Sequence, residues 1–269
     1  MKKTIAVLLA VSLVLLSAVV FADDAPMALF GETLVPIKSS EIQLVDEDID
    51  VFTNVNEFPG KASVTAVLRF KNLSDKDLTL LVGFPLDKEY NDTTEGEYYS
   101  TKQLDFKVEV NGNKVHPRTF YDKQQERTWF VWEQKFPAKK KVIIKHDYKV
   151  PTWGSNHIDP EGYDIQYFQY ILTTGALWAG NIERATITIH FDKPLNTKYY
   201  YAIPKTTMQS AKQVKWVLKD FEPKSEVTFA YSWAKDTKKI FQFLKEQDQR
   251  AKTEGKSVAR EIKDVRTSK

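Results

Sequence analysis

The chain of 269 residues contains 42% apolar and 28% charged residues, carries a formal net charge of +3 and has no cysteine. This composition is typical of a globular protein and argues against a chain that is disordered throughout. Without cysteine the protein has no disulfide, thiolate metal site, cysteine nucleophile or cysteine-linked lipid anchor, so its stability has to come from an apolar core.

The first 22 residues have the pattern of a bacterial secretory signal peptide. Two lysines precede an apolar run, and Val20 and Ala22 place small residues at the −3 and −1 positions before Asp23. The apolar run is also long enough for an uncleaved membrane anchor, but the small residues before an acidic start favour cleavage. We therefore predict a signal peptide over 1–22 and a mature protein in the periplasm or outside the cell, without a transmembrane segment after cleavage.

Between residues 32 and 233, apolar and polar residues alternate with a period of two, which is typical of half-buried antiparallel strands. In the run 184–191, for example, Ala185, Ile187 and Ile189 face one side while polar residues face the other. About eleven such runs occur, too many for one small sheet. The sequence predicts an all-β fold, a mostly antiparallel β-sandwich built as one large module or as two stacked modules.

Polar segments predict how the strands are arranged and where they turn. The acidic stretch 46–50 lies on a strand-like run, and solvated charges on a sheet edge explain it, because they discourage pairing with other chains. The segment 86–103 has the composition of a long polar loop. Asn111 and Gly112 lie between two alternating runs and favour a hairpin turn with positive φ.

A segment rich in proline, glycine and polar residues, 150–164, predicts a division in the chain. We place an N-terminal β-sandwich module over 23–155. The following residues, 156–234, form either a second β module or a continuation of the same sandwich, and the sequence leaves both arrangements open.

Aromatic residues crowd the region 153–178. Rings exposed on a strand face stack against sugar rings or peptides, whereas buried rings fill a core. Neither face of the expected strand 163–172 is purely polar, so both roles stay open. The candidate binding residues are Trp153, Tyr163, Tyr167, Tyr170 and Trp178, and the contact surface would include the loop 86–103.

The stretch YILTTGALWAG (170–180) predicts the corner of a sheet. Thr173 to Gly175 end one strand, and Gly180 frees the chain to enter the next. We expect the ring of Trp178 to plug the end of the core, with its N–H donating to a carbonyl oxygen.

No motif for catalysis or for a cofactor is present in the chain: the zinc-protease, serine-hydrolase, P-loop and dinucleotide patterns are all missing. His146 and His190 fall at polar positions of strand-like runs, so we expect both to face solvent. Asp159, Glu161 and Asp164 supply oxygen ligands of the kind that Ca²⁺ takes, but their spacing matches no calcium loop. The sequence therefore predicts no metal site and no cofactor, and it gives no positive support for an enzyme.

The last segment, 235–269, is basic and differs in pattern from the rest of the chain. Its apolar residues recur at steps of three and four, which predicts an amphipathic helical tail. This helix would pack on the sandwich, or it would contact anionic lipid or cell-wall polymer. Because the positive charge lies at the two ends and the body is net negative, we expect no binding of nucleic acid.

Three stretches resemble a bacterial secreted family known as domain of unknown function 4424. In YILTTGALWAGNIERATITI the strand, the Thr-Thr-Gly turn, the tryptophan and the next strand follow in the family's order. The stretches EIQLVDEDIDVF and VTAVLRFKNLSDKDLTLLVGFPLD are similar to its N-terminal half. The segment from Val64 to Tyr148 also resembles the β-sandwich modules of vault and inter-alpha-trypsin type proteins. Neither resemblance implies catalytic residues, and the first family's function is unknown.

These observations predict an exported, non-enzymatic binding or scaffold protein of the bacterial cell envelope. The alternative is a carbohydrate-binding module or a glycan-active hydrolase. The expected partner is an envelope protein or a glycan, and the sequence makes no prediction about the oligomeric state.

Overall fold

The computed structural model describes residues 20–21, 24–30, 33–55, 60–85, 104–122, 127–155, 165–195 and 200–232. Most of these residues form strands, and one short 3-10 helix, η2 (Thr173–Leu177), is also present. The predicted all-β class is therefore confirmed. Three predicted segments lie outside the described residues: the tail 235–269, the loop 86–103 and the part of the signal peptide before Val20. In the described ranges no helix is long and apolar enough to cross a membrane.

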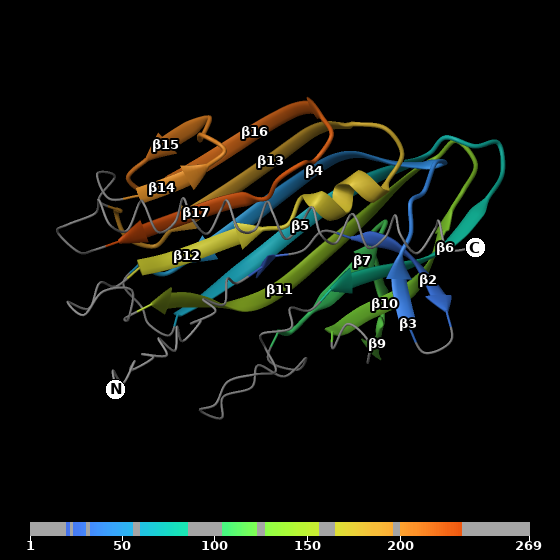
Figure 1. Cartoon of the computed structure of the whole chain (residues 1–269), viewed down its shortest axis with the longest axis horizontal. Coiled ribbons are helices and arrows are strands. Elements are labelled where there is room, and N and C mark those ends of the chain that lie inside the picture. The colour runs from blue at the N-terminus through green and yellow to red at the C-terminus, as the bar shows by residue number, and fades with distance from the viewer. Residues whose placement is uncertain are drawn as a thin grey trace, which may run out of the picture.

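The larger sheet has twelve strands and contains the longest strands of the protein (Figure 1). Nine of them follow one another across the sheet in the order β14 (Tyr200–Ile203), β17 (Val227–Ser232), β12 (Ile165–Tyr170), β11 (Lys141–Ser155), β5 (Gly60–Asn72), β4 (Ile42–Thr53), β13 (Ile182–Phe191), β16 (Gln213–Phe221) and β15 (Met208–Ser210). Three short strands lie beside this path: β1 (Val20–Phe21) pairs with β12, and β7 (Lys107–Val110) pairs with β11 and β8 (Asn113–Val115).

The smaller sheet has five strands. Their order is β3 (Thr33–Pro36), β2 (Ala25–Phe30), β6 (Leu78–Pro85), β10 (Arg127–Phe136) and β9 (Arg118–Asp122). Strand pairs in both sheets are antiparallel, as predicted, except that β13 runs parallel to β4 and β1 runs parallel to β12.

The apolar and polar alternation sets which side chains each strand buries. On β13, Ala185, Ile187 and Ile189 are buried as the sequence predicted, whereas Thr186 and Thr188 on the opposite side, which we expected to face solvent, are buried as well. The hairpin between β7 and β8 is also confirmed, because Asn111 and Gly112 have φ of 50° and 79°. Both residue types accept these left-handed angles, which match the twist of the flanking strands.

The two ends of the larger sheet face each other, with β12, β17 and β14 in front of β13 and β16 (Figure 1). Phe191 on β13 lies with its ring centroid 5.6 Å from that of Phe229 on β17, and Trp216 on β16 lies 6.4 Å from the same ring. Side chains of one sheet therefore fill a core between its own strands.

The smaller sheet covers another part of the inner face of the larger sheet. The ring centroid of Phe84 on β6 is 5.2 Å from that of Tyr148 on β11, and Phe136 on β10 is 5.9 Å from Phe70 on β5. These rings belong to one buried apolar cluster together with Phe191 and its neighbours. The two sheets thus share a continuous core, whose burial is the main favourable contribution to folding.

The expected position of the acidic stretch 46–50 on a sheet edge is wrong. It lies on β4, a central strand between β5 and β13. The guanidinium of Arg69 on β5 contacts the carboxylates of Asp46 and Asp48 at 2.5 and 2.7 Å. Glu47 points the other way and is buried. The acidic residues therefore lie beside a neighbouring cation or in the interior, and not on a sheet edge.

The expected solvent exposure of His146 is also wrong. Ile144, His146 and Tyr148 share the inward side of β11, and the histidine has no exposed surface. The adjacent Ile143 and Ile144 made the phase of the alternation ambiguous. His190 does lie on the outward side, with 30% of its side chain exposed.

Strands from both predicted modules contribute to the larger sheet. β4 pairs with β13, and β11 pairs with β12 through Trp153 and Tyr167. Part of the dividing segment, 156–164, lies outside the described residues, and the division into modules stays a prediction.

Candidate functional site

The structure describes four of the five candidate binding residues. Tyr163 lies outside the described residues. Trp153 on β11 and Tyr167 on β12 are cross-strand neighbours, and only their backbone is described. Tyr170 and Trp178 are 3% and 1% exposed. These last two side chains belong to the core and leave no ring face for a ligand.

Trp178 closes the core at the corner after β12, as the sequence predicted. Its indole lies with its ring centroid 4.7 Å from that of Phe70, and its Nε1–H donates to the backbone oxygen of Asp24 at 2.9 Å. Gly180 follows with φ of 67°, which allows the chain to turn into β13. The burial of both the ring and its polar atom indicates a structural role for Trp178.

The carboxylate of Glu226 holds the Thr-Thr-Gly turn in place. Its oxygens accept the backbone N–H of Leu172 at 2.5 Å, the N–H of Thr173 at 3.3 Å and the hydroxyl of Thr173 at 2.5 Å. Burial raises the pKa of Glu226 above its usual value, although these three hydrogen bonds act in the opposite direction. Nothing in the sequence around Glu226 indicated this contact, since it joins the residue before β17 to the turn after β12, 54 positions away from Leu172.

A second unpredicted feature is the contact between Asp24 and His146 inside the core. The Nε2 of His146 lies 3.4 Å from Oδ2 of Asp24, and both side chains are buried. The rings of Phe84, Phe106 and Trp132 surround the imidazole with centroid distances of 5.4, 5.3 and 5.8 Å. Burial lowers the pKa of His146 to about 3, so the imidazole is neutral at ordinary pH.

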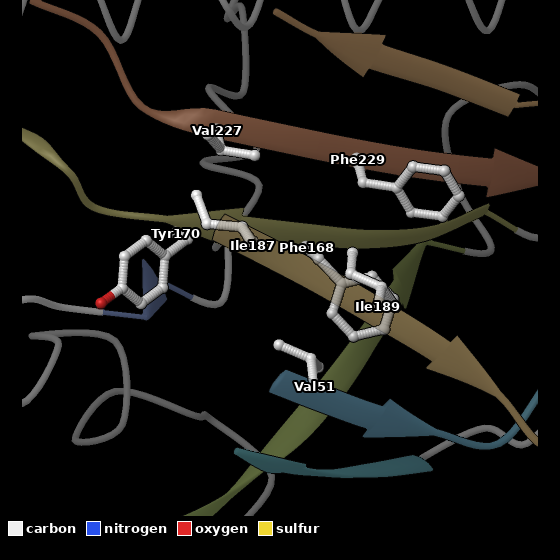
Figure 2. A pocket seen from close by; sticks show the side chains of 7 residues that line it. All are labelled: Val51, Phe168, Tyr170, Ile187, Ile189, Val227 and Phe229. Carbon is white, nitrogen blue, oxygen red and sulfur yellow. The ribbon is translucent and has the colours of Figure 1, made fainter. Parts of the chain in front are cut away.

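One pocket in the described interior is too small for a ligand larger than water. Figure 2 shows a pocket where β12 and β17 face β4 and β13, lined by apolar side chains and Tyr170. Its cavity volume is about 10 Å³, which is about the room that one water molecule needs. The three residues considered for Ca²⁺, Asp159, Glu161 and Asp164, lie outside the described residues. Within the described ranges no group of three or more metal-ligating side chains occurs.

The outer face of the larger sheet, the face turned away from the core, carries an exposed aromatic ring. Phe52 on β4 is 53% exposed. Its ring stacks on the imidazole of His190 on β13, with centroids 4.4 Å apart and planes 9° from parallel. The Nε2 of His190 lies 2.8 Å from Oδ1 of Asp50, which orients the imidazole. We refer to Phe52 and His190 as the stacked pair.

The stacked pair lies in a row of outward side chains that crosses five strands. Ser63 on β5 is the cross-strand neighbour of Phe52, and Lys149 on β11 is the neighbour of Ser63. On the other side, Gln213 on β16 is the neighbour of His190. The stacked pair is therefore bordered on both sides by polar side chains that can donate and accept hydrogen bonds.

Sequence analysis missed the stacked pair because its members are far apart in the chain. His190 and Asp50 are separated by 140 positions. The available signal was Phe52 itself, a large apolar residue at an outward position of an alternating run. Nothing in the pattern showed that the parallel pairing of β4 and β13 would bring His190 beside it.

The fold and the described surfaces define a mostly antiparallel all-β protein of two sheets. A family model described as domain of unknown function (DUF4424) matches residues 37–125, which confirms the resemblance to this family over that part of the chain. The Thr-Thr-Gly corner lies outside the matched residues. The likeness to vault and inter-alpha-trypsin type modules is not confirmed. No curated protein sequence matches the chain.

A solved structure of low sequence identity shares the fold, and two others are less similar. A Legionella pneumophila protein for which nutrient binding has been proposed matches with a TM-score of 0.58 and 19% identity over 78% of this chain and 70% of that one. Native leukotriene A4 hydrolase from Saccharomyces cerevisiae has a TM-score of 0.43 and 11% identity over 71% of this chain and 29% of that one. An M1 zinc metallopeptidase from Deinococcus radiodurans has a TM-score of 0.35 and 10% identity over 73% and 43%. The chain spans less than half of either enzyme, and these two matches carry no argument.

Proposed function

We propose that this chain is an exported, non-enzymatic binding or scaffold protein of the bacterial cell envelope, and that it contacts its partner through the stacked pair. The exposed ring of Phe52 is the observation that carries the proposal. Large aromatic side chains dominate binding energy where they are presented at a surface, because they combine a large apolar area with few rotatable bonds.

The interior pocket next to Tyr170 is too small to bind a nutrient. It has a volume of only about 10 Å³ and is lined mainly by apolar side chains. A nutrient-sized ligand needs a cavity of roughly 300 Å³ or more. The nutrient-binding role proposed for the Legionella protein is consistent with a binding role here, and the stacked pair supplies a place for it outside the core.

The sequence supports export. The first 22 residues have the charge, apolar run and small-residue pattern of a signal peptide, and the chain has no cysteine that a secreted protein would leave unpaired. Cell fractionation of the producing bacterium tests this step directly. We expect the shortened, mature form in the periplasmic or extracellular fraction, and recovery of full-length protein in the cytoplasm would contradict the proposal.

The binding step is tested with the mature chain, beginning at Asp23, presented to purified peptidoglycan and to an envelope extract. We expect retention of one of these materials by the wild type and loss of retention in Phe52→Ala. Ile143→Ala is the matched control, because Ile143 is also exposed on the outer face, at 42%. Retention of neither material, or equal retention by both variants, would contradict the proposed surface.

A further inference from the structure

One face of the Phe52 ring is open. His190, on β13, covers the face that points toward that strand, with the two rings nearly parallel at 9°. The opposite face points toward β5, where the cross-strand neighbour is Ser63. Serine is too small to cover a phenyl ring, and Phe52 keeps 53% of its surface exposed. We refer to the space above Ser63, beside this open face of the ring, as the slot.

Lys149 on β11 stands opposite Phe52 across this slot. It is the cross-strand neighbour of Ser63, so two strand spacings, about 9 to 10 Å, separate the backbones of Phe52 and Lys149. The hydrogen bond from Thr65 Oγ1 to Asp147 Oδ1, at 2.7 Å, crosses the next row of the sheet and borders the slot. This spacing accommodates one flat ring stacked on Phe52, with polar groups around its rim.

The two lysines nearest to the open face each contact a carboxylate. The Nζ of Lys149 lies 3.6 Å from Oδ2 of Asp105, and the Nζ of Lys145 lies 2.6 Å from Oδ2 of Asp147. A neutral ligand that needs both an apolar contact and several hydrogen bonds fits these surroundings better than an ion does. A pyranose ring has this combination, since its C–H groups stack on an aromatic face while its hydroxyls point outward.

We infer that the open face of Phe52 is a subsite for a pyranose ring of a neutral glycan, with Ser63 and Lys149 contacting the sugar hydroxyls. This inference rests on the proposed binding function and names the ligand class of the same surface. His190 acts as a positioning residue: it supports the far side of the phenyl ring and is itself held by Asp50 at 2.8 Å.

A protein partner docking through apolar contact is the less favoured occupant. On the described part of this face, Ile143 on β11 is another large apolar side chain that is exposed. It lies six residues from Lys149 along the strand, roughly 20 Å away. Among the described side chains, the exposed apolar groups of this face therefore form no continuous patch of the size that marks protein interfaces.

Titration of the mature chain, beginning at Asp23, with chitotetraose, cellotetraose and maltotetraose tests the inference. Binding is followed by saturation-transfer NMR and calorimetry, with choline chloride as a cationic probe. We expect at least one oligosaccharide to bind, with affinity lowered about tenfold or more in Phe52→Ala, because a stacked aromatic contact contributes roughly that factor. Phe52→Trp keeps a stacking face and should retain binding, and Ser63→Leu fills the slot and should abolish it.

Ile143→Ala is again the control and should bind as the wild type does, while thermal melting confirms that each variant is folded. No oligosaccharide binding at about 10 mM, equal binding by Phe52→Ala, or binding of choline in place of sugar would overturn the glycan subsite. Retention of peptidoglycan or an envelope protein that survives Phe52→Ala would overturn the subsite and leave a binding role for another surface. If the wild type binds no oligosaccharide and retains neither peptidoglycan nor an envelope protein, both proposals are overturned.

Discussion

Replacing Trp178 with alanine should destabilise the protein by about 3 to 5 kcal/mol, which is the range for removing a large buried aromatic side chain. The indole is 1% exposed and packs edge-on against Phe70, with centroids 4.7 Å apart, and against Phe136 at 6.2 Å. Removal leaves a cavity between rings that the regular strands around them hold in place, so collapse of the site is limited. The loss should appear as a lower urea midpoint at an unchanged slope.

A second variant separates packing from hydrogen bonding at Trp178. Trp178→Phe keeps an aromatic ring in the core but removes the Nε1–H that donates to the backbone oxygen of Asp24 at 2.9 Å. Loss of a donor to a buried acceptor costs about 1 to 3 kcal/mol, so this variant should fall between the wild type and the alanine variant. It also keeps the test informative if Trp178→Ala is unfolded, since typical stabilities are only about 5 to 15 kcal/mol.

Two results would refute the assignment of Trp178 to the core. An alanine variant with a stability within about 1 kcal/mol of the wild type would show that the ring contributes little to packing. An alanine variant that unfolds like the wild type but no longer retains peptidoglycan or envelope protein would show that the corner is a binding site. Equal losses in the alanine and phenylalanine variants would instead assign the stabilisation to the hydrogen bond.

Two further predictions concern other buried contacts. Because burial raises the pKa of Glu226 above 4.5, its protonated form favours the folded state, and this contribution is lost as pH rises through the raised pKa. The stability of the wild type relative to Glu226→Gln, followed by urea unfolding upward from pH 4.5, should therefore fall as pH rises, and a constant difference would contradict this. Gly83→Ala should cost about 1 to 3 kcal/mol, because the added Cβ would lie 2.7 Å from Cγ of Met27. The cost should fall when the same change is made in Met27→Ala, and an equal cost in both backgrounds would rule out this clash.

Local patterns in the sequence predicted the local structure well. The alternation over 184–191 placed Ile187 and Ile189 in the core, and the Asn111-Gly112 pair predicted the hairpin between β7 and β8. Each of these features depends on neighbouring residues, because side chains alternate along a strand and turn geometry is set by the residues within the turn. The burial of Trp178 followed from the same kind of local argument.

The pairing of distant strands was beyond these patterns. The parallel register between β4 and β13, which joins Phe52 to His190, depends on the whole fold and leaves no periodic trace in either strand. Missing this pairing led to the wrong placement of the acidic stretch 46–50 on an edge, and it hid the stacked pair. The same limit applies to Glu226, whose contact with Thr173 spans 53 positions.

Asp24 shows how strongly the N-terminal segment is tied to the rest of the molecule. Its backbone oxygen accepts the indole N–H of Trp178, and its side chain faces His146 at 3.4 Å in a buried, aromatic environment. Burial outweighs the attraction of the nearby Asp147 charge, which keeps the imidazole neutral with a pKa of about 3. Ala25 and Met27, which follow on β2, are buried as well. The segment directly after the predicted cleavage site is therefore part of the core that Trp178 closes, and contacts from β11 and from the Thr-Thr-Gly corner converge on this one residue.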